Sequence, residues 1–163
     1  MVALLVLTPP GNLVRMTESV SAAAVPSIRQ VVVDCPDARA LAEFYRLLFG
    51  LRYRPGDEPP SPGEPDPHGE DWLVLRGVAG GMGLAFQQVA ALPEPTWPDG
   101  PRPQMLHLDS TVPTIEALFE QRRRAIGLGA RELLDRFDDP DEPLFVFADL
   151  ARHPFCIFVA PES

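Results

Sequence analysis

An internal repeat is the feature of this sequence that most limits its possible folds. When the chain is aligned with itself, starting with Gln30 opposite His107, several later residues match without a gap. The matched pairs are Pro36 with Pro113, Ala40-Leu41 with Ala117-Leu118, Glu43 with Glu120, and Gly50-Leu51 with Gly127-Leu128. Together with a repeated order of elements, these pairs indicate internal duplication. The sequence therefore predicts two related modules, at residues 28–90 and 104–160.

Each module is predicted to contain a strand, a helix and three further strands. In module one, β-branched residues 28–34 predict a strand, and apolar residues three and four apart predict an amphipathic helix from Ala38 to Gly50. Shorter strands are expected at 51–54, 72–75 and 82–88. In module two, the expected elements are strands at 105–112, 131–134, 144–147 and 155–159, and a helix at 115–126. The pattern predicts an α+β fold.

The remaining segments are expected to connect or flank the modules. Residues 55–69 are rich in Pro, Gly and acidic residues and predict a surface loop, as does the acidic run 135–142. The proline-dense segment 92–101 is the expected join between the modules. Residues 1–26 are expected to form an N-terminal extension to a domain at 27–163. Met16 offers an ordinary start, so residues 1–15 are interpreted as an upstream extension, with a disordered tail as the alternative.

Composition restricts the possible partners and compartment. The chain has 163 residues, which suits one domain, and a formal charge of −9 without any lysine. A role in binding nucleic acid or a membrane surface is therefore not expected. The apolar segment 2–7 is too short to span a bilayer. Two cysteines, Cys35 and Cys156, are too few for a disulfide framework, which favours a cytoplasmic location.

The repeated module resembles the vicinal oxygen chelate superfamily of glyoxalases, bleomycin-resistance proteins and extradiol dioxygenases. The resemblance rests on Phe44-Tyr45 followed by Leu48-Phe49-Gly50-Leu51, and on the segments 95–98, 107–109 and 149–156, which look like its glyoxalase-like branch. It implies two βαβββ modules pairing into a U-shaped mixed sheet around a cleft, and a homodimer. It also implies a small-molecule ligand.

In metal-dependent members of this superfamily, ligands lie on the first and last strands of each module. By resemblance, these positions fall on Gln30 and His107, on Cys156, and on Gln87 or its neighbours. None of the four is a carboxylate. Hard divalent ions such as Mg²⁺, and divalent ions of borderline hardness, normally require carboxylate ligands. Cys156 is interpreted as a buried small hydrophobe between Phe155 and Ile157. A metal-free cleft is therefore favoured, although a divalent metal stays possible.

His107 is the candidate catalytic residue, because an imidazole can exchange a proton with a bound ligand. A purely structural hydrogen bond is an equal alternative for it. Asp109 is expected to share its face, since strand residues two apart point the same way. The other candidates for substrate binding are Gln30, Gln87, Trp97 and Cys156. His153 is expected to make a structural hydrogen bond and His68 to be solvated, while Trp72, Phe86 and Phe147 are possible cleft walls.

Three functions remain open from the sequence. The leading interpretation is a glyoxalase-like protein that binds a small organic molecule in its cleft. The first alternative is a divalent-metal-dependent lyase or dioxygenase of the same superfamily, which would need a carboxylate in the cleft. The second is an antibiotic-sequestering resistance protein, which the negative charge would favour for a cationic drug if the acidic loops at 57–70 and 135–142 border the cleft.

Overall fold

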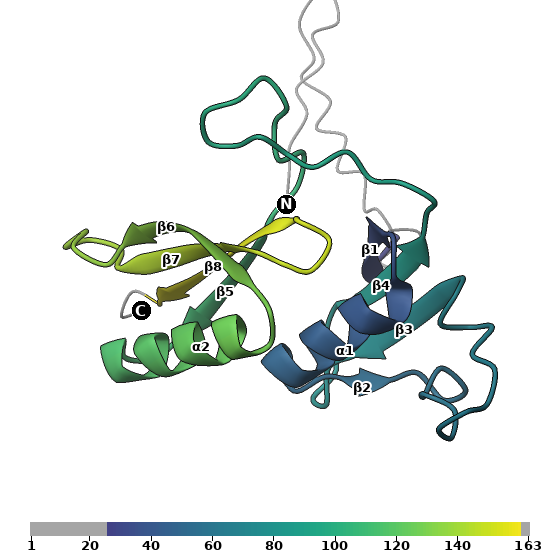
Figure 1. The fold of residues 1–163 in the computed structure, drawn as a ribbon. Coiled ribbons are helices and arrows are strands. Elements are labelled where there is room, and N and C mark those ends of the chain that lie inside the picture. The colour runs from purple at the N-terminus through teal and green to yellow at the C-terminus, as the bar shows by residue number, and fades with distance from the viewer. Residues whose placement is uncertain (1–25, 161–163) are drawn as a thin grey trace, which may run out of the picture.

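A computed structural model of the chain describes residues 26–160. The predicted N-terminal extension and the apolar segment 2–7 therefore lie outside the described residues, apart from residue 26. The described chain is α+β, with two helices and eight strands (Figure 1). The elements are β1 (Gln30–Cys35), α1 (Ala38–Phe49), β2 (Arg52–Tyr53), β3 (Trp72–Arg76), β4 (Gly83–Gln88), β5 (Leu108–Val112), α2 (Ile115–Gly127), β6 (Arg131–Arg136), β7 (Leu144–Ala148) and β8 (Pro154–Val159).

The two modules have the same sheet topology. Module one forms a mixed sheet in the order β1-β4-β3-β2, and module two forms one in the order β5-β8-β7-β6. The first and last strands of each module are parallel neighbours, whereas the other pairs are antiparallel. The predicted α+β fold of two βαβββ modules is confirmed, and β1 and β5 each lie at the edge of their own sheet.

The helices begin and end where the sequence predicts. The Asp37 carboxylate accepts a hydrogen bond from the Ala40 amide at the start of α1. Thr114 Oγ1 accepts one from the Ala117 amide at the start of α2. Both side chains thereby satisfy a backbone donor that a helix leaves unpaired at its N-terminus. Gly50 ends α1 at φ 65°, a left-handed conformation that costs glycine little.

A single hydrophobic core joins the modules through α1. Tyr45 stacks against Phe86 of its own sheet, with ring centroids 5.8 Å apart. On the same helix, Phe44 meets Phe155 of β8 edge-on at 5.8 Å. All four side chains are at most 2% exposed. Since α1 contacts both sheets, the modules cannot separate without exposing this aromatic core.

Strand β5 begins later than expected. The sequence predicts a strand from Met105, but β5 starts at Leu108. Met105 has a φ of 64°, and the Leu106 amide donates to the Gln104 carbonyl across it at 2.7 Å. This tight turn bends the chain away from an extended conformation, so that His107 lies just before the strand.

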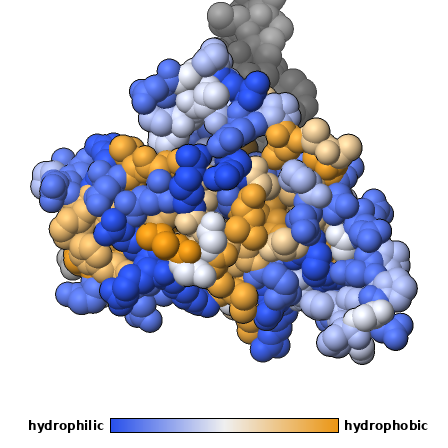
Figure 2. Space-filling model, viewed as in Figure 1, coloured by the Kyte–Doolittle hydropathy of each residue, from blue (hydrophilic) through white to orange (hydrophobic). Residues whose placement is uncertain are grey.

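The surface is mixed in character. On the face shown in Figure 2, hydrophobic residues lie in several separate groups with hydrophilic residues between them. Neither of the two described helices is long and apolar enough to cross a membrane.

Candidate functional site

The parallel pairing of β5 with β8 positions the candidate site. Asp109 lies opposite Cys156 in this pair, and Leu108 lies opposite Phe155. Leu108 and Phe155 turn toward the hydrophobic core. Because side chains alternate along a strand, Asp109 and Cys156 turn to the other face of the sheet. His107 precedes β5 and reaches the same face.

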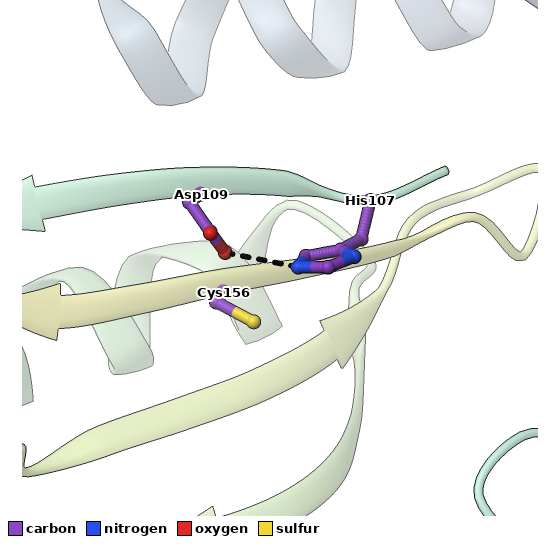
Figure 3. Close-up of side chains that lie close together, drawn as sticks. All are labelled: His107, Asp109 and Cys156. Carbon is purple, nitrogen blue, oxygen red and sulfur yellow. Dashed lines mark ion pairs between the residues drawn. The ribbon is translucent and has the colours of Figure 1, made fainter. Parts of the chain in front are cut away.

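Three potential ligand atoms converge on this face (Figure 3). His107 Nε2 lies 3.4 Å from Asp109 Oδ1, and the Cys156 thiol completes a group whose ligand atoms all lie within 4.8 Å of one another. The side chains of His107 and Asp109 are 39% and 58% exposed, so that the group is open to solvent. The predicted common face of His107 and Asp109 is therefore observed, with Cys156 beside them.

Cys156 differs from its expected environment. It is half-buried on the face opposite the core residues Phe155 and Ile157, so that the interpretation as a buried hydrophobe is wrong. Cys35 is instead the cysteine that packs in the core. Burial and then the negative charge of Asp109 raise the pKa of the Cys156 thiol to about 12. Without a bound cation the group is therefore a thiol rather than a nucleophilic thiolate at neutral pH.

The first-module positions belong to the other sheet. Gln30 begins β1 opposite Gly83, and Gln87 lies opposite Asp34 in the β1–β4 pair. Gln87 is exposed. Within residues 26–160, the buried Gln30 Oε1 has no hydrogen-bond partner. Because buried polar atoms normally have a hydrogen-bond partner, Gln30 stays a candidate contact for a ligand, although its oxygen is buried in the described structure.

Two of the aromatic candidates lie in the core, and the other two are half-buried. Phe86 and Phe147 are fully buried in the core, so that they are not walls of an open site. Trp72 is half-buried on β3. Trp97 is half-buried in the connection between the modules, where the Thr96 and Arg102 backbones hydrogen-bond to each other. Trp97 and Trp72 therefore remain candidate contacts for a ligand rather than established parts of the site.

The other two histidines lie away from this cluster. The His153 ring Nδ1 lies 3.0 Å from Asp149 Oδ2, as expected for a structural hydrogen bond. Asp149 is 2% exposed and also accepts hydrogen bonds from the Ala151 and His153 amides and from Tyr45. Sequence reasoning overlooked this carboxylate, although its spacing of four residues from His153 is a visible signal. His68 is 62% exposed, in agreement with the expected solvated position.

Two hollows of the described chain lie elsewhere. One of about 320 Å³ lies between the end of α1, the edge of β5 and α2, and its lining includes Phe49, Thr111 and Arg124. The other, of about 400 Å³, is lined by residues that include Glu43 and Tyr53. Neither is lined by His107, Asp109 or Cys156, so that these three side chains form an open cluster on the sheet.

The carboxylate of Asp109 changes the chemistry that the sequence suggested. The four metal-ligand positions implied by resemblance contain no carboxylate. Asp109 adds an anionic oxygen to the nitrogen of His107 and the sulfur of Cys156. The alternation of side chains along the strand predicted the position of Asp109 beside His107, but not its combination with Cys156.

Comparisons with known proteins agree with this architecture. The family model described as "Glyoxalase-like domain" matches residues 30–158. Comparison with curated proteins gives no match. One similar solved structure is a possible glyoxalase from Bacillus cereus, at 15% identity and a TM-score of 0.57, covering 82% of this chain and 98% of that one.

Two further solved structures have the same fold. A glyoxalase/bleomycin resistance protein/dioxygenase family enzyme from Burkholderia phytofirmans PsJN has 17% identity and a TM-score of 0.59, with coverage of 81% of this chain and 97% of that one. The fosfomycin resistance protein FosX from Listeria monocytogenes, complexed with Mn(II) and sulfate ion, has 14% identity and a TM-score of 0.57, with coverage of 84% and 94%. The match of the family model over most of the described chain shows that this protein belongs to the glyoxalase-like domain family.

Proposed function

We propose that this protein binds a small organic molecule on the face of β5 and β8 that turns away from the core. The observation that carries the proposal is the convergence of His107, Asp109 and Cys156 within 4.8 Å on that face. An imidazole can donate or accept a hydrogen bond, and a carboxylate accepts one. The cluster can therefore orient a ligand that carries both hydrogen-bond donors and acceptors.

The charge around the cluster favours a cationic ligand. Asp109 is exposed on the binding face, and Glu142 is close enough that its charge contributes to the raised pKa of Cys156. Two carboxylates attract a cation and repel an anion. A phosphonate such as fosfomycin, to which FosX gives resistance, should therefore bind more weakly than an organic cation.

The antibiotic-sequestering alternative receives support from only one of the two acidic loops. In the loop at 57–70, Asp57 pairs with Arg54 and Asp66 pairs with Arg39, so that two of its five carboxylates are neutralised within module one. The charges that raise the pKa of Cys156 include Glu142 but no residue of this loop. The loop at 135–142 ends at Glu142, near the cluster. Binding of a cationic drug would accordingly depend on Asp109 and Glu142.

The first alternative, a divalent-metal-dependent lyase or dioxygenase, required a carboxylate in the cleft. Asp109 meets this requirement, because it lies 3.4 Å from His107 Nε2. This observation keeps metal-dependent chemistry as a second candidate function. The homodimer and the cytoplasmic location both stay predictions from the sequence.

Histidine-selective NMR would test ligand binding directly, because the chain has only three histidines. We would label histidine Cε1 with ¹³C in chelator-treated protein and assign the signals with His68→Gln, His107→Gln and His153→Gln variants. The probes would be tetraphenylphosphonium as an aromatic cation, catechol as a neutral diol and fosfomycin as an anion. We expect tetraphenylphosphonium to move the His107 signal saturably and to leave the exposed His68 signal unchanged.

An Asp109→Asn variant gives the matched control. Loss of one charge at about 4 Å in a solvated site is worth about 1 kcal/mol, which corresponds to about a fivefold loss of affinity for the cation. Catechol, which is neutral, should lose less. The proposal would be refuted if none of the three probes moved the His107 signal at millimolar concentration, or if all three histidine signals moved in parallel.

A further inference from the structure

The positions of His107, Asp109 and Cys156 follow from regular strand geometry. Asp109 and Cys156 are cross-strand partners, and His107 lies two residues before Asp109. Ser110 Oγ donates a hydrogen bond to the Cys156 carbonyl at 2.7 Å, which holds β5 and β8 in this register. Asp109 and Cys156 are therefore held on a hydrogen-bonded pair of strands, and His107 lies on the residue directly before β5.

The distances between these donors suit a tetrahedral metal ion. Zinc lies about 2.0–2.2 Å from nitrogen and oxygen ligands and about 2.3 Å from sulfur, which places the ligands about 3.3–3.7 Å from each other. In the structure, His107 Nε2 and Asp109 Oδ1 are 3.4 Å apart, and all three donors lie within 4.8 Å. Small side-chain rotations would close the remaining distance.

The donor types select among metal ions. A thiolate, an imidazole and a carboxylate together favour Zn²⁺ and Co²⁺ over Mg²⁺, Mn²⁺ and Ca²⁺, which prefer oxygen ligands. A neutral His107, an ionised Asp109 and a Cys156 thiolate also supply two negative charges, which balance a divalent cation. Three protein ligands leave one position for water or for an organic ligand, as in catalytic zinc sites.

We propose that His107, Asp109 and Cys156 form a zinc-type metal site on a single module, with one coordination position open toward solvent. The site shares His107 and Cys156 with the positions implied by resemblance, but it adds Asp109, which lies outside those positions, and it omits Gln30 and Gln87, which lie on the other sheet. The proposal rests on the proposed function in that the ion would lie on the same binding face. It replaces the metal-free interpretation favoured by the sequence.

Titration with Co²⁺ tests this site without any organic ligand. Chelator-treated, reduced protein would be titrated with CoCl₂ and followed by absorption spectroscopy. We expect a thiolate-to-cobalt charge-transfer band and the intense visible bands of four-coordinate Co²⁺, saturating at one ion per chain. Zn²⁺ should abolish the bands by displacement, whereas millimolar Mg²⁺ should not.

The two cysteines provide matched variants. Cys156→Ala should lose the charge-transfer band, whereas Cys35→Ala, which changes the buried core cysteine, should retain it. Asp109→Asn should weaken Co²⁺ affinity at least about tenfold. Circular dichroism would verify folding, and His107→Gln offers a second ligand variant at an exposed position.

The outcomes separate this inference from the proposed function. Absence of the band in wild-type protein, or its survival in Cys156→Ala, would overturn the metal site. Unchanged affinity in Asp109→Asn would overturn the three-ligand assignment. If cobalt failed to bind while tetraphenylphosphonium still moved the His107 signal, the metal site would be refuted and the organic-ligand site would be retained. If cobalt bound while no organic probe did, the metal site would stand and the proposed function would fail.

Discussion

The hydrogen bond between Tyr45 and Asp149 makes a sharp prediction about how the modules are held together. Tyr45 lies on α1 of module one, and Asp149 lies in the turn between β7 and β8 of module two. The hydroxyl donates to Asp149 Oδ2 at 2.8 Å, and the two residues are 1% and 2% exposed. Burial and the Asp149 carboxylate hold the pKa of Tyr45 well above its usual value, so that the hydroxyl stays protonated and remains a donor.

The Tyr45→Phe variant removes this donor and keeps the ring that stacks on Phe86. A hydrogen bond to a charged group contributes about 1.5–3 kcal/mol. Asp149 would keep its donors from the Ala151 and His153 amides, at 2.8 and 2.9 Å. We therefore expect the free energy of unfolding to fall by about 2 kcal/mol, which corresponds to a decrease of about 4–8 °C in the midpoint of thermal unfolding.

Tyr53→Phe is the matched control, because the Tyr53 hydroxyl also donates to a carboxylate, Glu43, at 2.7 Å. This pair is only half-buried and lies within module one, so its loss should cost about 0.5–1 kcal/mol. Urea unfolding followed by circular dichroism would measure both variants, with unchanged m values expected. Equal losses in the two variants, or a loss below about 0.5 kcal/mol in Tyr45→Phe, would refute the importance of burial for this contact.

Three further predictions concern electrostatics, capping and packing. Hydrogen bonds from Arg39 lower the pKa of Asp66, so that their pairing stabilises the fold above about pH 4 and is lost as pH falls through the lowered pKa. The stability difference between wild type and Arg39→Gln should accordingly shrink by about 0.5–1 kcal/mol between neutral pH and about pH 3, and a constant difference would contradict this. Asp37→Ala removes the cap of α1 and should cost about 1 kcal/mol in urea unfolding, whereas a neutral effect would show that the cap is dispensable. Phe155→Ala should cost about 3–5 kcal/mol, because this fully buried ring packs on three others, and a loss below about 1 kcal/mol would show that the core can collapse around it.

The local elements were predictable because their signals lie within a few residues of each other. Apolar spacing predicted α1, and the repeat predicted its counterpart α2. The start of β5 was misplaced, since the turn at Met105 carries no proline or glycine to mark it. A positive φ in a methionine depends on surrounding structure rather than on its own preference.

The candidate site was only partly predictable. His107 and Asp109 were placed on one face by strand alternation alone, and that prediction agrees with the structure. Cys156 was assigned to the core because free cysteine is commonly buried, whereas the pairing of β8 with β5 turns it to the opposite face. The resemblance drew attention to Gln30 and Gln87, which lie on the other sheet.

The sequence by itself determined the two βαβββ modules and the bounds of most of their elements, because periodicity, caps and turn residues act over a few residues. Only the tertiary structure decided that Asp109 and Cys156 are cross-strand partners and that Tyr45 reaches Asp149. Both contacts join residues far apart in the chain, and they depend on strand register and on how α1 packs against the second module. No local pattern encodes such distances, because they follow from burying one shared core.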